Sequence, residues 1–154
     1  MELKRKFCAM LKKFDYLGLL IKTKNIIKIM KKQLDKVRAF QYAFNQTVNE
    51  NPTLLPITES ELRFSLGREE LEEYEQAYDD RDLVDVLDSL VDQAYVLFGT
   101  INAHGLQDLF LEAFDLVHYN NMSKLDENGE VLKNEFGKVI KPANFKPVDL
   151  KQLF

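Results

Sequence analysis

The strongest constraint on the fold of this chain is a group of acidic residues on two segments that are otherwise rich in apolar residues. Glu70 and Glu73 precede a short chain reversal, and Asp85 and Asp88 follow it. Both segments have the spacing of amphipathic helices, in which each residue is rotated by about 100° from the one before. An isolated ionised carboxylate in an apolar setting is costly unless a cation compensates its charge. We therefore expect a helical hairpin that brings four carboxylates to one metal site.

The position of the reversal determines which acidic residues meet. If the chain turns near residues 79–80, an antiparallel pair of helices puts Glu73 level with Asp85. Glu70 is then level with Asp88, one helical turn further from the bend. Ligation by oxygen atoms alone favours a hard divalent ion, Mg²⁺ or alternatively Mn²⁺, over zinc. These four residues are therefore predicted to be the ligands of Mg²⁺.

Two further charged residues belong to the surroundings of this site. In the expected register, Asp92 is level with Leu66, beyond the cluster, and we expect it to support the ligands rather than to bind the metal. Arg63 shares the helix face of Glu70. We expect Arg63 to be a structural counter-ion for the carboxylates and not a substrate contact.

The charge of the chain is distributed unevenly. Residues 1–36 contain eleven basic and three acidic side chains, a net charge of +8, which leaves −12 for the remainder of a chain whose total is −4. We therefore expect two parts, a basic helical extension over 1–36 and a helical domain over 37–154. The basic extension could contact nucleic acid or an anionic membrane, although packing on the acidic domain is the simpler interpretation. Native translation from Met30 would make the first part dispensable.

Composition favours a helical protein of the cytoplasm. Aromatic residues are plentiful, whereas the chain has only 6 glycines and 4 prolines. The single cysteine, Cys8, excludes an intramolecular disulfide and fits a reducing compartment. The apolar run at 16–20 is too short for a transmembrane segment, because Lys22 and Lys24 interrupt its continuation.

The spacing of apolar residues predicts an all-α bundle. A break at 15–18 should divide the basic extension into two helices. Further helices are expected over about 35–48, 58–78, from the 79–82 bend to near 105, and 106–120. Thr58 and Glu61 fit a capping box at the start of the first acidic helix. A small C-terminal hairpin is expected to pair 131–133 with 139–141.

Several ordered motifs resemble one known superfamily. Residues 68–73 (REELEE) and 85–88 (DVLD) resemble the EExxE and ExxD motifs of the all-α nucleoside triphosphate pyrophosphohydrolases, which include MazG, the dimeric dUTPases and phosphoribosyl-ATP pyrophosphohydrolase. Residues 94–100 (AYVLFGT), 118–124 (HYNNMSK) and 137–141 (GKVIK) are similar to segments of the MazG-like branch.

The resemblance covers roughly Val37 to Leu150 and has no counterpart for residues 1–36. It departs from the superfamily pattern at Asp85, where a glutamate is usual. The carboxylate is retained, but it is one methylene shorter, and this makes Asp85 the weakest member of the proposed ligand set.

The resemblance also implies a catalytic role for Glu69. The four carboxylates would hold Mg²⁺ on the triphosphate, and Glu69, next to them in sequence, would orient or deprotonate the attacking water. An equally weighted interpretation is that Glu69 is an exposed helix acid paired with Arg68 or a lysine.

The downstream motifs imply contacts with the phosphates. Asn121 and Lys124 would bind the anionic oxygens, since an amide and an ammonium are suitable partners for them. Without the resemblance, this segment would be interpreted as an ordinary helix end with a surface lysine. Lys138 and Lys141 are weaker candidates for the same role, because solvated lysines are common in hairpins.

These implications combine into a functional hypothesis with two alternatives. The expected activity is Mg²⁺-dependent cleavage of a (deoxy)nucleoside triphosphate to the monophosphate and pyrophosphate, in a homodimer or dimer of dimers. Oligomerisation is expected because the second acidic helix is apolar on most sides. The alternatives are phosphoribosyl-ATP as substrate, or a non-catalytic metal-binding helical protein with an anion-binding basic extension.

Overall fold

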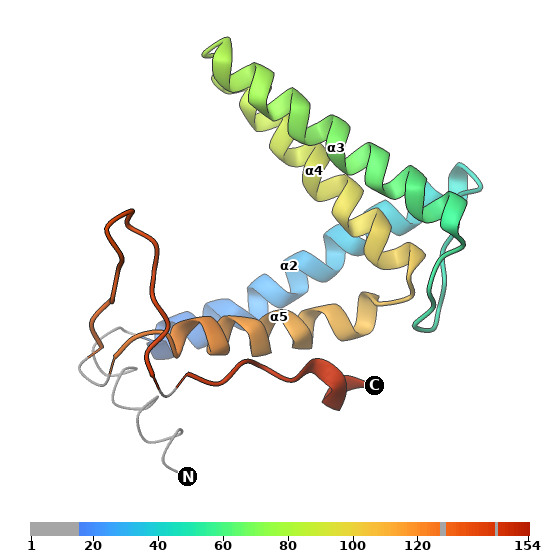
Figure 1. Cartoon of the computed structure of the whole chain (residues 1–154). Coiled ribbons are helices and arrows are strands. Elements are labelled where there is room, and N and C mark those ends of the chain that lie inside the picture. Colours follow the sequence, from blue (N-terminus) through green and yellow to red (C-terminus); the bar gives the residue numbers. More distant parts are fainter. Residues whose placement is uncertain (1–15, 127–128, 144) are drawn as a thin grey trace. The chain divides into compact units, whose positions relative to one another are not determined.

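The computed structural model describes residues 16–126, 129–143 and 145–154, and within these it is helical (Figure 1). The elements are α2 (Tyr16–Ala43), α3 (Ile57–Asp79), α4 (Leu83–Ala103), α5 (Gln107–Met122) and a short 3-10 helix, η1 (Leu150–Leu153). The all-α class predicted from the sequence is confirmed. None of the helices in the described ranges is long and apolar enough to span a membrane.

The chain forms two compact units. One unit is Ile29–Asp108, which contains α3 and α4, and the described residues of the other come from 16–28 and from 109–154. The helix that was predicted for the first part of the basic extension falls on residues 1–15, which lie outside the described part of the chain.

Helix α2 is longer than the sequence analysis predicted. It is already helical at Tyr16–Gly18, where a break was expected, and it continues through Asp35, where a new helix was expected to start. No glycine or proline occurs between Leu19 and Ala43, so nothing in the backbone interrupts the helix. The helix ends before the predicted Val48, because Asn45 adopts a left-handed φ of 55°.

The start of α3 differs from the prediction. Its N-cap is Pro56, with φ −53°, and no side chain caps it. The capping box of Thr58 and Glu61 is therefore wrong: Ile57 is already helical, so Thr58 lies inside the first turn and not at the cap. Proline is suited to a helix start because its fixed φ is close to the helical value.

The reversal between α3 and α4 is formed as predicted, but its centre differs. Asp82 caps α4, and its carboxylate accepts hydrogen bonds from the backbone N–H groups of Val84 at 2.8 Å and Asp85 at 3.3 Å. Arg81 adopts a left-handed φ of 59°. The turn is therefore centred on Arg81 and not on residues 79–80. Figure 1 shows α3 and α4 lying side by side as an antiparallel pair.

The end of α4 lies in the buried core of its unit. Leu34 and Val37 of α2 are buried, as are Ile101 and Ala103 of α4. Leu55, from the loop before α3, is buried as well. The base of the acidic hairpin is therefore fixed by packing within the chain.

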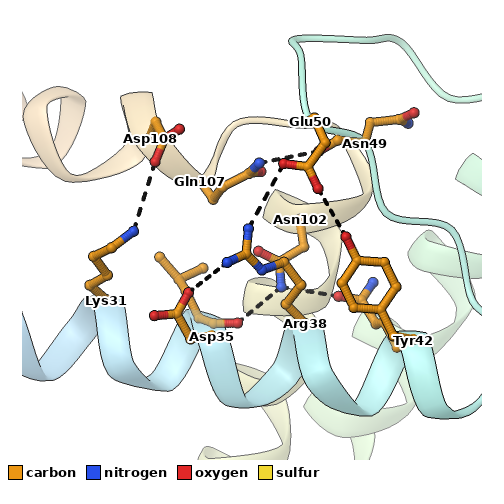
Figure 2. Close-up of polar contacts among 11 residues, drawn as sticks. Lys31, Asp35, Arg38, Tyr42, Asn49, Glu50, Asn102, Gln107 and Asp108 are labelled. Atoms are coloured by element: carbon orange, nitrogen blue, oxygen red, sulfur yellow. Dashed lines mark hydrogen bonds and ion pairs between the residues drawn. The ribbon is translucent and has the colours of Figure 1, made fainter.

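Two buried amides join α2 to the end of α4 (Figure 2). Asn102 is fully buried, and its Nδ2 donates to the carbonyl of Leu34 at 3.1 Å and to Oε1 of Gln41 at 3.0 Å. Gln41 in turn donates through Nε2 to the carbonyl of Gly99 at 3.0 Å. Buried polar groups need such partners, and here these bonds fix the register of α2 against α4.

Polar contacts also attach the loop after α2 to this core. The Tyr42 hydroxyl donates to Glu50 at 2.9 Å, and Arg38 pairs with Asp35 at 3.1 Å and with Glu50 at 3.9 Å (Figure 2). Asn49 donates through Nδ2 to the carbonyl of Ala103 at 2.6 Å. The loop is thus tied to both helices of the core.

Helix α4 ends at a glycine, as predicted. His104 is its C-cap, and Gly105 follows with a left-handed φ of 68°. A Cβ at Gly105 would collide with the carbonyl oxygen of Asn51. Only glycine meets both requirements at this position.

The segment after α5 contains bridges and no strand within the described residues. Lys133 pairs with Val139, as the predicted hairpin required, and Leu125 pairs with Val131. Gly137 has a φ of 78°, which confirms the turn expected there. Asn120, near the end of α5, donates to the carbonyl of Lys146 at 2.6 Å. That bond holds the C-terminal segment to α5.

Candidate active site on the α3–α4 hairpin

Glu70 is the most unusual carboxylate of the hairpin. The residue is half-buried, and its Oε2 is fully buried without a hydrogen-bond partner in the described structure. Burial raises the pKa of Glu70, and the charges of Asp92, Glu73, Glu69 and Asp88 raise it further, in that order. A buried oxygen surrounded by like charges is favourable only when a cation compensates them.

The register of the hairpin brings Asp92, rather than Asp88, level with Glu70. Glu70 and Asp92 are equally far along the chain from Arg81, the centre of the turn. A hydrogen bond from Nε2 of Gln93 to the backbone carbonyl of Glu70, at 3.1 Å, fixes this alignment. The expectation that Asp92 is level with Leu66 is therefore wrong, because the turn is centred later in the chain.

The same shift moves the other acidic residues. Asp88 is level with the turn of α3 that contains Glu73, and both side chains are exposed. Asp85 is exposed in the first turn of α4, nearer the bend, and is not among the charges that act on Glu70. Glu73, Asp88 and Asp92 are thus near enough for their charges to act on Glu70, whereas Asp85 lies nearer the bend.

The carboxylate groups of the hairpin are not arranged around a single metal position. Among the residues that the structure describes, no three acidic, histidine or cysteine side chains are close enough to hold a metal ion together. Exposed side chains of like charge repel one another and extend into solvent. Glu70 and Asp92 are half-buried, whereas Glu73 and Asp88 are exposed.

Glu69 lies beside the cluster and is exposed. Its charge contributes to the raised pKa of Glu70. Within the described chain, Glu69 forms no ion pair with Arg68 or with any lysine, so its carboxylate is open to solvent and to a ligand.

Arg63 also lacks the carboxylate partner that the sequence analysis gave it. Its guanidinium is half-buried, and burial lowers the pKa of Arg63. In the described residues, no ion pair joins it to Glu70 or to any other acid of the hairpin. Glu59, one turn earlier on α3, is the acid whose charge acts on it.

The predicted phosphate contacts lie in the other unit. Nζ of Lys124 donates to Oδ1 of Asn121 at 2.7 Å, so the two side chains form one polar pair at the C-terminal end of α5. Lys138 is exposed, and its backbone N–H donates to Asn134 at 2.9 Å. The Lys141 ammonium lies over the ring of Phe145, 5.0 Å from its centroid.

The all-helical fold and the acidic hairpin define the class of the protein as that of the MazG-like all-α nucleoside triphosphate pyrophosphohydrolases. The chain belongs to the phosphoribosyl-ATP pyrophosphohydrolase family, whose family model matches residues 37–121. The match begins at Val37, where the sequence resemblance was expected to begin, and it includes both acidic helices. A comparison with curated proteins gave no match.

Family membership confirms the enzyme class that was predicted from the sequence. Members of the family are pyrophosphohydrolases, which act on phosphoric anhydride bonds. Sequence reasoning missed the hydrogen bond of Gln93 to the Glu70 carbonyl and the alignment of Asp92 with Glu70. The signal for both is the centre of the turn: counting outward from Arg81 instead of residues 79–80 aligns Asp92 with Glu70 and Gln93 with the neighbouring Glu69.

Proposed function

We propose that the protein is a Mg²⁺-dependent pyrophosphohydrolase that cleaves a (deoxy)nucleoside triphosphate to the monophosphate and pyrophosphate. The observation that carries this proposal is the buried, unpartnered Oε2 of Glu70 amid carboxylates from both helices of the hairpin. Such an arrangement is destabilising by itself and becomes favourable when a divalent cation binds.

The donor set fits a hard cation. Glu70, Glu73, Asp88 and Asp92 offer only carboxylate oxygens, which are the ligands that Mg²⁺ and Mn²⁺ prefer. The register favours Asp92 over Asp85 as the fourth ligand. When bound, the ion would neutralise negative charge that develops on the phosphate oxygens.

Glu69 is the residue that we assign to the attacking water. Its exposed carboxylate, adjacent in sequence to Glu70, can accept the proton of a water that attacks one phosphorus of the α–β anhydride. The new P–O bond forms as the bridging P–O bond of the anhydride breaks; pyrophosphate leaves when the α-phosphorus is attacked, and the nucleoside monophosphate when the β-phosphorus is attacked. The proton moves to the Glu69 carboxylate and is then released to solvent.

The Asn121–Lys124 pair is assigned to the phosphate chain. The hydrogen bond between them already orients the ammonium, so less side-chain freedom is lost when an anion binds. Lys138 is exposed and can add a second positive charge, whereas Lys141 is engaged with Phe145 and is the weaker candidate.

Phosphoribosyl-ATP is the second candidate substrate, because the matching family is named for that activity. Incubation of the purified protein with Mg²⁺ and a panel of ribo- and deoxyribonucleoside triphosphates, together with phosphoribosyl-ATP, distinguishes the two. We expect pyrophosphate release from at least one triphosphate, and its loss with a chelator. Release from phosphoribosyl-ATP alone would replace the first proposal with the second. No release from any compound, with metal still bound, would favour the non-catalytic alternative.

Apolar side chains exposed on α4 support assembly of the enzyme as a homodimer or a dimer of dimers. Leu83, Val84 and Leu87 are 80%, 75% and 63% exposed. A contiguous exposed apolar stripe on a helix is typical of an interface. We expect light scattering to give at least twice the 18.0 kDa mass of the chain. Leu87→Glu should reduce it, whereas Glu72→Lys, an exposed substitution of comparable size on α3, should not.

A further inference from the structure

Arg63 is half-buried, so its guanidinium has lost part of its hydration, and no acceptor among the described residues replaces the lost water. The guanidinium lies against the backbone of α4, where a Cβ on Gly99 would be only 3.1 Å from Nη1. Neither a hydrogen bond nor an ion pair of this group is found in the described structure. Because a guanidinium has five donors and no acceptor, such a site is prepared for a ligand with acceptor atoms.

The position of Arg63 relative to the acidic cluster narrows the choice of ligand group. Arg63 precedes Glu70 by two helical turns on the same face of α3, which is about 10 Å along the axis at about 1.5 Å per residue. Arg63 and Gly99 are level, as Glu70 and Asp92 are, since the members of each pair are equally far from Arg81. The guanidinium is therefore held in its own layer, away from the carboxylates.

A nucleotide extends over a comparable length. If its anhydride lies at the carboxylates, its sugar and base reach along the hairpin, and the edge of the base falls in the layer of Arg63. A guanidinium binds two adjacent acceptors in one plane, such as O6 and N7 of a 6-oxopurine or O2 and N3 of cytosine. Adenine and thymine offer no such pair of adjacent acceptors and match it less well.

We propose that Arg63 binds the acceptor edge of the substrate base and that it selects 6-oxopurine and cytosine nucleotides. Because Gly99 has no side chain, the Arg63 guanidinium can lie against the backbone of α4 at this position. This inference rests on the proposed function for the identity of the substrate, and it replaces the role of structural counter-ion that the sequence suggested for Arg63.

The test compares Arg63→Gln with Arg68→Gln, which removes the same charge from an exposed position of the same helix. The full chain with Mg²⁺ is assayed on dGTP, dCTP, dATP and dTTP. A bidentate contact contributes about 1–3 kcal/mol of discrimination, so kcat/KM for dGTP and dCTP should fall about 10-fold or more in Arg63→Gln, mainly through KM. Values for dATP and dTTP should change less than about 3-fold, and Arg68→Gln should resemble the wild type.

Two further probes locate the contact. Replacing dGTP by 7-deaza-dGTP removes the N7 acceptor, and this change should weaken wild-type turnover but not that of Arg63→Gln. Gly99→Ala should give a smaller loss with the same base dependence, because Nη1 must move by a few tenths of an ångström. Equal losses on all four nucleotides, or weaker inhibition of Arg63→Gln by inorganic tripolyphosphate, would overturn the proposal in favour of a phosphate contact.

Binding of dGMP in the presence of a chelator tests Arg63 without turnover. Calorimetry should detect dGMP binding to the wild type and to Arg68→Gln, and at least about 10-fold weaker binding to Arg63→Gln. Equal binding by the wild type and Arg63→Gln, or no binding by the wild type, would overturn the inference. Absence of pyrophosphate release from every nucleotide, with this dGMP difference intact, would instead count against the proposed function alone.

Discussion

The two ends of α4 differ in what holds their side chains. At its C-terminal end, Ile101 and Asn102 are 6% and 0% exposed, and the Asn102 amide is bonded to α2. At its N-terminal end, Leu83 and Val84 are 80% and 75% exposed. At the buried end, the side chains of α4 have their packing and hydrogen-bond partners within the chain. At the outer end, apolar and acidic side chains are exposed, and a second chain or a ligand would have to supply their partners. Stability should therefore depend on the base of the hairpin and activity on its outer part.

The largest expected effect separates activity from stability at Glu70. Glu70→Gln removes a charged ligand, and we expect kcat to fall about 10³-fold or more. The metal-free protein should not lose stability, because a buried carboxylate among like charges is replaced by a neutral amide. Pyrophosphate release and thermal unfolding with a chelator measure the two effects. Full activity in this variant would refute the site assignment, and a lowered unfolding temperature would show that Glu70 also supports the fold.

The opposite result is expected at the base. Asn102→Ala removes two hydrogen bonds from a fully buried position and leaves a cavity, which should cost about 2–4 kcal/mol in the free energy of unfolding. Urea denaturation measures this change. Glu72→Ala, at an exposed position of α3, is the control and should change stability by less than about 0.5 kcal/mol. An equal loss in the free energy of unfolding for Asn102→Ala and Glu72→Ala would contradict the assignment of stability to the base of the hairpin.

A smaller effect tests the register of the outer part. Asp92 is level with Glu70, and Asp85 is nearer the bend. Asp92→Asn should therefore lower kcat/KM about 30-fold or more, whereas Asp85→Asn should lower it about 3-fold or less. The two variants make the same chemical change on the same helix, so each is the control for the other. A larger loss at Asp85 would restore the alignment expected from the sequence.

The helices and their class could be predicted because they depend on local signals. Apolar spacing predicted α3 and α4, and the bend was expected at 79–82, where Asp82 caps α4. The register could not be predicted, because it depends on the left-handed conformation of Arg81, a residue type that carries no signal for it. A shift of the turn by one to two residues moved Asp92 from the periphery to the position level with Glu70.

That Arg63 has no acidic partner among the described residues could not be predicted from the sequence either. Its place on the face of Glu70 could be read from the spacing, but the absence of an acidic partner in the described residues depends on how far each carboxylate lies from it. The continuity of α2 through Asp35 is a third case: a new helix was expected to start there, but residues 19–43 contain no glycine or proline that would favour a break.

The smallest expected effect concerns pH at the base. The hydroxyl of Tyr42 donates to Glu50 at 2.9 Å, and this bond raises the pKa of Tyr42 above its ordinary value of about 10. Because the folded state holds the phenolic proton more tightly, the bond stabilises the fold fully below about pH 10, and this contribution is lost as the pH rises through the folded pKa. Wild type should therefore be slightly more stable than Tyr42→Phe at pH 8, and the difference should shrink towards pH 11 in urea denaturation. All other tyrosines are common to both proteins and cancel. A constant difference over this range would mean that the phenol does not depend on Glu50, and a change in kcat/KM at pH 8 would show that the base and the outer part are coupled.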